Sequence, residues 1–88
     1  MVVTLKLFAM LRDYLPQGAS PRSHLDNEVR VEVPAGTTVQ EVLGRFPMPP
    51  QLVQLVLVNG VFIPPEERRS HALHEGDALA IWPPVAGG

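Results

Sequence analysis

Alternation of apolar and polar positions predicts two strands in the first third of the chain. Residues 2–8 place apolar side chains at every second position, with Thr4 and Lys6 between them. Residues 28–33 repeat the pattern with three valines separated by charged residues. A period of two is typical of a strand with one face in a core and the other in solvent. By this alternation Phe8 falls on the polar face of the first strand.

The segment between these strands has two parts. Residues 9–15 carry apolar side chains at helical spacings and predict a short helix that ends at Pro16. Residues 17–27 are rich in Gly, Ser, Pro, Asp and Asn, which is a loop composition. This loop is long for a connection between two strands.

One longer helix is predicted near the middle of the chain. Thr38 followed by Glu41 indicates a capping box, and Pro47 ends the helix. A helix of about two and a half turns is not stable in isolation, so this one must pack on a sheet. Its apolar stripe consists of Val39, Val42, Leu43 and Phe46.

Two further strands follow, joined by a tight turn. Residues 52–58 are almost all apolar, which predicts a strand covered on both faces or one in the interior of the sheet. Asn59-Gly60 is a strong signal for a hairpin turn into a short strand over residues 61–63. The polar residues 66–74 then indicate a turn or a 3₁₀ segment.

The last strand is predicted over residues 78–82, after a tight turn at residues 75–77. Its core face carries Leu79 and Ile81, so Trp82 lies on the other face. If the first and last strands are neighbours, Phe8 and Trp82 form an exposed aromatic patch, a feature that marks interaction sites. The alternative is that the short helix or the long loop covers both rings. The order of elements is strand, short helix, strand, helix, and three strands, which predicts a single α+β domain.

Composition narrows the functional classes. The chain has 88 residues, of which 45% are hydrophobic and 18% charged, as in a globular domain. The net charge is −2 and the basic residues are dispersed, which argues against nucleic-acid binding. The absence of cysteine favours a reducing compartment, and no apolar run is long enough to span a membrane. We therefore expect a cytoplasmic protein.

No catalytic constellation stands out in the sequence. His24, His71 and His74 lack a nearby carboxylate cluster and make a poor metal site. The serines lie in predicted loops without an identifiable base, and there is no glycine-rich phosphate loop. We expect no bound metal or cofactor, and we expect that the chain is not itself an enzyme.

The last residues carry the chemistry that remains. Two prolines fix the backbone after the last strand, and Gly87 and Gly88 have no Cβ, so a narrow channel can admit them. We expect a domain over residues 1–84 and a flexible tail over residues 85–88. Adenylation by ATP in a partner enzyme would activate the Gly88 carboxylate, and a sulfur nucleophile would convert it to a thiocarboxylate. The tail residues expected to thread into a partner are Pro83, Pro84, Val85, Ala86 and Gly87.

Four segments carry a resemblance to a known family: Leu7–Asp13, Val58–Gly60, Leu73–Asp77 and Trp82–Gly88. With the order of elements they resemble the small subunit of molybdopterin synthase, within the ubiquitin-like β-grasp sulfur carriers. The resemblance implies a mixed sheet of about five strands with one main helix on one face. It also implies that the first and last strands are adjacent and parallel.

The same resemblance implies a set of partners and residue roles. An activating enzyme would adenylate Gly88 with ATP, and a sulfurtransferase would supply sulfur. A larger synthase subunit would receive the tail, and the thiocarboxylate would sulfurate a pterin precursor of molybdenum cofactor. By position in the motifs, Phe8, Arg12 and Trp82 are similar to partner-face residues.

Other functions use the same kind of tail. The thiazole-forming carrier of thiamine synthesis shares the fold and the Gly-Gly end, although its chains are usually shorter and lack the Phe-Ala-x-x-Arg and Pro-Pro features present here. Carriers for cysteine synthesis or tRNA thiolation have a similar end. A protein modifier would attach Gly88 to lysines, but a single lysine, Lys6, argues against chains built on the protein itself. A docking module without tail chemistry would tolerate loss of Gly88.

Overall fold

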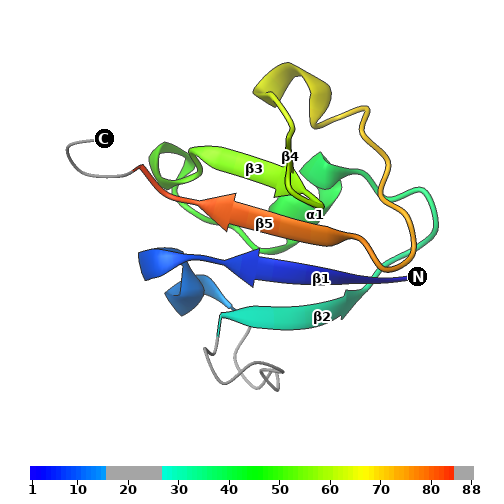
Figure 1. Ribbon diagram of the computed structural model, residues 1–88, viewed down its shortest axis with the longest axis horizontal. Helices are drawn as coiled ribbons and strands as arrows, with labels where there is room; N and C mark the ends of the chain where they lie inside the picture. The colour runs from blue at the N-terminus through cyan, green and yellow to red at the C-terminus, as the bar shows by residue number, and fades with distance from the viewer. Residues whose placement is uncertain (16–26, 85–88) are drawn as a thin grey trace.

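The computed structural model describes residues 1–15 and 27–84, which form one mixed sheet with an α-helix packed on one of its faces (Figure 1). The sheet has five strands in the order β2-β1-β5-β3-β4, and this confirms the predicted α+β class. The strands are β1 (Val2–Leu7), β2 (Glu28–Glu32), β3 (Leu55–Val58), β4 (Val61–Phe62) and β5 (Ala78–Trp82). The helical segments are α1 (Val39–Arg45) and the short 3₁₀ segments η1 (Ala9–Tyr14), η2 (Pro50–Leu52) and η3 (Pro65–Glu67).

The two ends of the described chain meet at the centre of the sheet. β1 and β5 are parallel neighbours, with Leu5 opposite Leu79 and Leu7 opposite Ile81. β2 joins the outer edge of β1 in antiparallel pairing, and β3 pairs antiparallel with both β5 and β4. Because β1 and β5 run in the same direction, their carboxyl ends lie side by side at the same end of the sheet (Figure 1). The predicted adjacency of the first and last strands is confirmed.

The helix α1 forms as its sequence predicts. The amide of Glu41 donates to the Thr38 hydroxyl at 3.2 Å, and the Thr38 amide donates to the Glu41 carboxylate at 2.9 Å. This reciprocal capping box satisfies two amides that a helix start otherwise leaves free. Val39 and Val42 are fully buried, and Leu43 packs on the core from its edge.

The core lies between α1 and one face of the sheet. Alternate side chains of β1, β2 and β5 point into it, as the period of two predicts. Leu11 of η1 is also fully buried, so this short segment is anchored to the sheet. The buried apolar residues are Val3, Leu5, Leu7, Leu11, Val29, Val31, Val33, Val39, Val42, Val56, Val58, Ile63, Leu73, Leu79 and Ile81.

One of our two expectations for residues 52–58, a single strand covered on both faces, is wrong. Its start belongs to η2, and β3 begins only at Leu55. Val56 and Val58 are buried in the core, whereas Leu55 points to the opposite face and is 42% exposed. The one α-helix of the described residues covers one face, so every second apolar side chain of β3 remains outside the core. The alternative expectation, an interior position, is correct because β3 lies between β5 and β4.

The predicted tight turns are confirmed by their backbone angles. Asn59 and Gly60 join β3 to β4 with φ of 51° and 84°, the left-handed values that this type of hairpin turn requires. The turn at residues 75–77 places Gly76 at φ 85°. Residues 9–14 form a 3₁₀ segment, and the polar stretch after Pro64 begins with η3.

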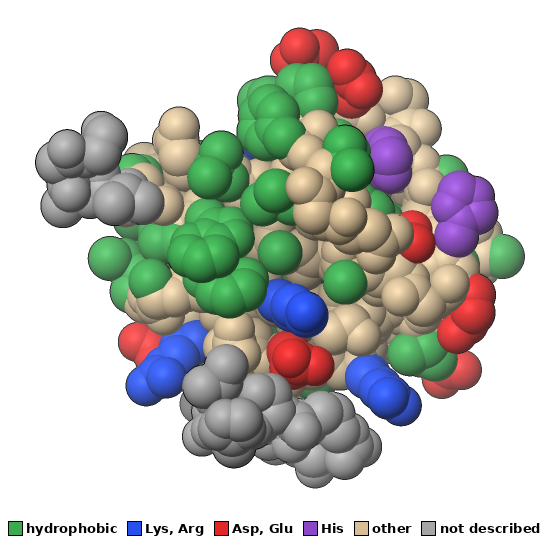
Figure 2. Space-filling model, viewed as in Figure 1, with side chains coloured by type: hydrophobic (Ala, Val, Ile, Leu, Met, Phe, Trp, Pro, Cys, Tyr) green, Lys and Arg blue, Asp and Glu red, His purple; other side chains and the backbone are tan. Residues whose placement is uncertain are grey.

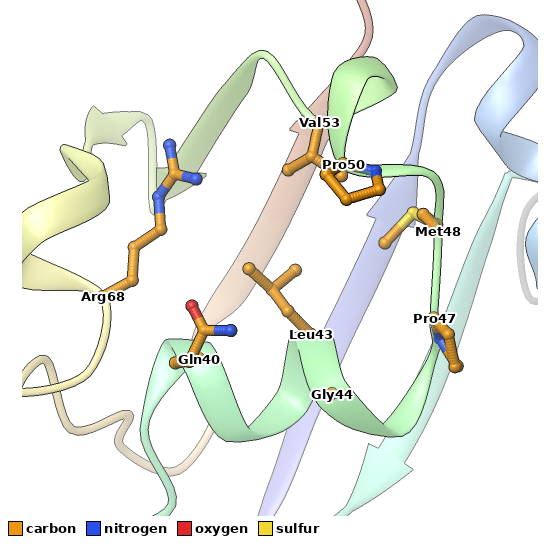
Figure 3. Close-up of a pocket in the computed structure, with 8 residues that line it drawn as sticks. All are labelled: Gln40, Leu43, Gly44, Pro47, Met48, Pro50, Val53 and Arg68. Carbon is orange, nitrogen blue, oxygen red and sulfur yellow. The ribbon is translucent and has the colours of Figure 1, made fainter.

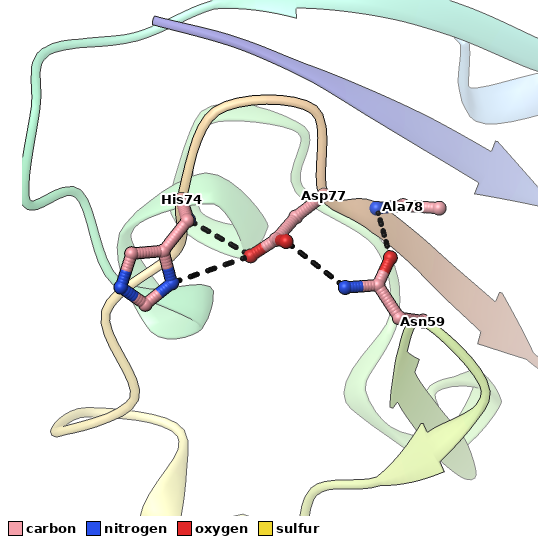
Figure 4. Close-up of polar contacts among 4 residues, drawn as sticks. All are labelled: Asn59, His74, Asp77 and Ala78. Carbon is pink, nitrogen blue, oxygen red and sulfur yellow. Dashed lines mark hydrogen bonds and ion pairs between the residues drawn. The ribbon is translucent and has the colours of Figure 1, made fainter.

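A polar network fastens these two turns to each other (Figure 4). The Asn59 amide nitrogen donates to the Asp77 carboxylate at 2.9 Å, and the backbone amide of Ala78 donates to the Asn59 side-chain oxygen at 3.0 Å. The backbone amide of His74 donates to the other Asp77 oxygen at 2.8 Å. Burial raises the pKa of Asp77, but the hydrogen bonds from His74 and Asn59 outweigh it and hold that pKa below its ordinary value. The network fixes the start of β5.

Two predicted segments lie outside the described residues. They are the tail over residues 85–88 and the part of the predicted loop up to residue 26. Within residues 1–15 and 27–84, no helix is long and apolar enough to cross a membrane.

Candidate partner-binding face and root of the C-terminal tail

The carboxyl ends of β1 and β5 bring two aromatic rings together. The Phe8 and Trp82 rings stack with centroids 4.0 Å apart and an angle of 4° between their planes. The cause is the parallel register: Leu7 and Ile81 pair in the core, so the next residue of each strand falls on the opposite face. The amide of Phe8 donates to the Ile81 carbonyl at 3.1 Å and continues the pairing to this point. The two aromatic rings predicted from alternation to meet on this face are therefore together, with Trp82 exposed and Phe8 half-buried.

The patch extends further than the sequence indicated. Leu55 lies opposite Trp82, and Leu57 lies opposite both Ala80 and Phe62, all on the open side of the sheet. Trp82 is 37% exposed and Phe62 is 47% exposed. We call this surface the apolar face; it consists of Phe8, Leu55, Leu57, Phe62, Ala80 and Trp82.

Figure 2 views the molecule from this open side. Hydrophobic side chains gather over the carboxyl ends of the central strands and over β3, and charged side chains lie around them, toward β2 and at the top and right margins of the view (Figure 2). Apolar surface of this extent on a small domain is typical of an interaction site. Sequence reasoning missed the contribution of β3 and β4, because only the register shows which side of β3 shares a face with Trp82.

The segment η1 forms the border of the apolar face. It starts directly after Phe8 with Ala9, whose φ of 52° is unusual for a residue with a Cβ. The buried Leu11 holds the segment in place, and this leaves Arg12 exposed. Phe8, Ala9 and Arg12 line one shallow hollow of about 530 Å³, together with Met10, Asp13 and Asn27. The structure thus places Arg12 on the same hollow as Phe8, one of the two stacked rings.

The tail leaves the domain beside the same stack. The carbonyl of Trp82 still accepts a hydrogen bond from the Gln54 amide at 3.0 Å, but Pro83 has no amide to continue the ladder. Pro83 is buried and Pro84 is exposed, so the chain is anchored at its root. The predicted tail residues Val85, Ala86, Gly87 and Gly88 lie outside the described residues.

Two histidines, His71 and His74, fall within the described residues. His74 is exposed, with its Nδ1 atom 3.9 Å from the Asp77 carboxylate, and His24 falls outside the described residues. Residues 1–15 and 27–84 contain no group of three or more histidine, cysteine or acidic side chains placed to hold a metal ion.

Comparison with solved structures defines the class of the protein. The fold is similar to that of SAMP1 from Haloferax volcanii, with a TM-score of 0.63 and 28% sequence identity over the whole of both chains. It is also similar to a chain in the complex of subunits 1 and 2 of molybdopterin-converting factor from Helicobacter pylori, with a TM-score of 0.56 and 16% identity over the whole of both chains. The protein is thus a ubiquitin-like β-grasp domain.

The sequence comparison is more specific. The profile of the ThiS family matches residues 6–88, which include the end of β1, the aromatic stack and the C-terminal residues. The chain belongs to the ThiS family and is a ubiquitin-like sulfur carrier. No curated protein matches the sequence.

Proposed function

We propose that this protein carries sulfur as a thiocarboxylate on Gly88 and delivers it as the small subunit of a molybdopterin synthase. The observation that supports this most directly is the stacked Phe8–Trp82 pair at the root of the tail. It gives a partner an apolar surface to bind at the point where the last residues of the chain begin. The chain acts as a protein cosubstrate, and the partner supplies the catalytic groups.

The proposed chemistry starts from an unreactive carboxylate. A carboxylate oxygen of Gly88 attacks the α-phosphorus of ATP in an activating enzyme, and pyrophosphate leaves. Sulfide derived from a sulfurtransferase then adds to the acyl carbon, and AMP leaves with the bond to oxygen. The absence of a Cβ at Gly87 and Gly88 keeps the acyl carbon accessible inside a narrow channel. ATP is therefore a cosubstrate held by the partner.

The apolar face is the proposed contact with the larger synthase subunit. Aromatic side chains near the centre of an interface commonly contribute most of the binding energy. Trp82 and Phe8 meet that description, and the exposed Arg12 beside them adds a charge that pairs with an acidic group. Pro83 is buried and anchors the root of the tail, and Pro84 is exposed.

The decisive experiment is the intact mass of the protein purified from its own cells, with sequencing of the C-terminal peptide. Replacement of one oxygen by sulfur at Gly88 would establish the carrier chemistry. The purified thiocarboxylate is then incubated with the larger synthase subunit and the pterin precursor. Loss of the sulfur to the pterin supports the molybdopterin assignment, and retention of the sulfur refutes it in favour of another carrier pathway.

A variant that lacks Gly88 is the matched control for this experiment. It retains every described residue, so its thermal unfolding should match that of the intact chain while sulfur loading is lost. An isopeptide bond between Gly88 and a lysine of another protein would instead identify a modifier. Full function without Gly88 would contradict both proposals and leave a docking module.

A further inference from the structure

A separate hollow of about 330 Å³ lies on the helix side of the molecule, away from the apolar face (Figure 3). One wall is α1, and the other is the segment that leads through η2 into β3. Leu43 and Val53 point into the space from these two walls, Met48 and Pro50 border it toward one end, and Arg68 borders it toward the other (Figure 3). The hollow is therefore apolar with one cationic side.

The guanidinium of Arg68 is held in a fixed position. The side chain is almost fully buried, with 8% exposed, and its Nε donates to the Ile63 carbonyl at 3.1 Å. The backbone carbonyl of Arg68 accepts a hydrogen bond from the Gln40 amide at 2.9 Å, which ties it to the start of α1. A guanidinium has five N–H donors. Within the described residues, the terminal nitrogens have no hydrogen-bond partner and are not sealed from solvent.

The charge of Arg68 is also incompletely compensated. No carboxylate lies within ion-pair distance of it among residues 1–15 and 27–84, and it is the one charged side chain that lines the hollow there. Burial lowers the pKa of Arg68, and the nearby charge of Glu66 acts in the opposite direction. The terminal nitrogens of a fixed guanidinium that reach the hollow and have no ion-pair partner there can bind an anion.

Gly44 keeps the hollow open from the side of the helix. It lies one turn after Gln40 on the same face of α1, and a Cβ built on it would meet nothing within 4 Å. Close packing therefore does not require a glycine here, and within a helix glycine is an unfavourable residue. A larger side chain at this position would project into the space beside Leu43.

We propose that this hollow binds a small-molecule carboxylate whose apolar body is about the size of one aromatic ring. The two carboxylate oxygens of the ligand match the planar fork of the Arg68 guanidinium. The side-chain amide of Gln40 lies toward the same end of the hollow as Arg68. The apolar body lies between Leu43 and Val53. A volume of about 330 Å³ is at the lower end of the range for ligand pockets, which fits a ligand of this size.

A ligand in the hollow would also contact a segment that is hydrogen-bonded to the root of the tail. Val53 lines the hollow, and the next residue, Gln54, donates its amide to the Trp82 carbonyl at 3.0 Å. The segment that contacts the ligand is thus bonded to the last residue of β5. This site is distinct from the apolar face and does not depend on the proposed sulfur chemistry.

The test uses phenylacetate as the probe and the neutral phenylacetamide as its matched analogue, each titrated into the full isotope-labelled chain at neutral pH. Phenylacetate should bind saturably with a Kd of about 1 mM, a normal affinity for so small a ligand. NMR shifts should appear at the Arg68 Nε–H and at the amides of α1 and residues 51–54. Phenylacetamide should bind roughly tenfold more weakly, because it cannot form the charge-assisted pair.

Three variants separate the site from general effects. Arg68→Gln should weaken phenylacetate binding by roughly tenfold, whereas Arg69→Gln, with the same change of charge at an exposed neighbour, should leave it unchanged. Gly44→Leu should fill the hollow and abolish binding without lowering the thermal midpoint, which keeps the test valid if Arg68→Gln unfolds. Equal affinity for the acid and the amide, shifts confined to the apolar face, or unchanged binding in Gly44→Leu would each overturn the proposal.

Discussion

Replacement of Asn59 by glycine tests how the start of β5 is held. Glycine accepts the left-handed backbone that Asn59 adopts at φ 51°, so the hairpin turn itself is retained. The substitution removes both side-chain hydrogen bonds of Asn59, one to the Asp77 carboxylate and one from the Ala78 amide. Any loss of stability therefore reports the connection between the two turns (Figure 4).

The expected loss follows from these two hydrogen bonds. A neutral hydrogen bond contributes about 1 kcal/mol and one to a charged group about 1.5–3 kcal/mol, with the lower values at partly exposed sites. Glycine also lowers the free energy of unfolding because it raises the entropy of the unfolded chain. Relief of the left-handed strain on asparagine offsets part of this loss. We expect a net loss of about 2 kcal/mol in the free energy of unfolding. In a domain of this size that lowers the thermal midpoint by roughly 8–16 °C.

The pH dependence provides a second, independent readout. The folded-state pKa of Asp77 is below its ordinary value, so the stability it contributes is present above the ordinary Asp pKa of about 4. That contribution is lost as the pH falls through the lowered folded-state pKa. Because protonation of Asp77 weakens the bond from Asn59 in the wild type, the difference between wild type and Asn59→Gly should shrink between neutral pH and about pH 3.

The measurement is urea unfolding followed by circular dichroism at several pH values for wild type, Asn59→Gly and Asn59→Asp. The aspartate variant keeps an acceptor for the Ala78 amide but places a second carboxylate against Asp77. It should be less stable than Asn59→Gly at neutral pH and recover in acid. A loss below about 0.5 kcal/mol for Asn59→Gly, equal at all pH values, would refute a stabilising network.

Three further predictions concern the candidate site. Trp82→Ala should weaken binding of the larger synthase subunit by about 2 kcal/mol in a calorimetric titration, and an unchanged affinity would exclude the apolar face as the contact. Ala9→Gly should leave stability unchanged or raise it by up to about 1 kcal/mol in thermal unfolding, because relief of the φ of 52° exceeds the entropy cost of glycine. Gly87→Phe should prevent adenylation, measured as ATP–pyrophosphate exchange by the activating enzyme, while thermal unfolding stays unchanged; normal exchange would contradict threading through a narrow channel.

Local rules explain which features could be predicted before the structure. The alternation in β1, β2 and β5, the capping box at Thr38 and the turn at Asn59 each depend on residues close together in sequence. Such features form with nearly the same geometry wherever they occur. The Gly-Gly end is also a feature of sequence alone, and the roles assigned to it remain predictions.

Features that depend on the pairing of distant segments could be predicted only in part. The apolar run before Asn59 did not reveal where β3 begins or that Leu55 lies outside the core, because a run without alternation carries no information on which face is covered. The stacking of Phe8 on Trp82 was expected only on the condition that their strands are neighbours, and the parallel register met that condition.

By itself, the sequence determined the order of elements and the positions of the helix and turns. Tertiary structure alone decided that β3 and β4 extend the aromatic patch, and that Arg68, in a stretch predicted only as a polar turn or 3₁₀ segment, is buried beside a hollow. The physical reason is that local backbone preferences act over a few residues. Burial of Arg68 and exposure of Leu55 depend on which elements cover which face, and that is settled only when strands from both ends of the chain pair.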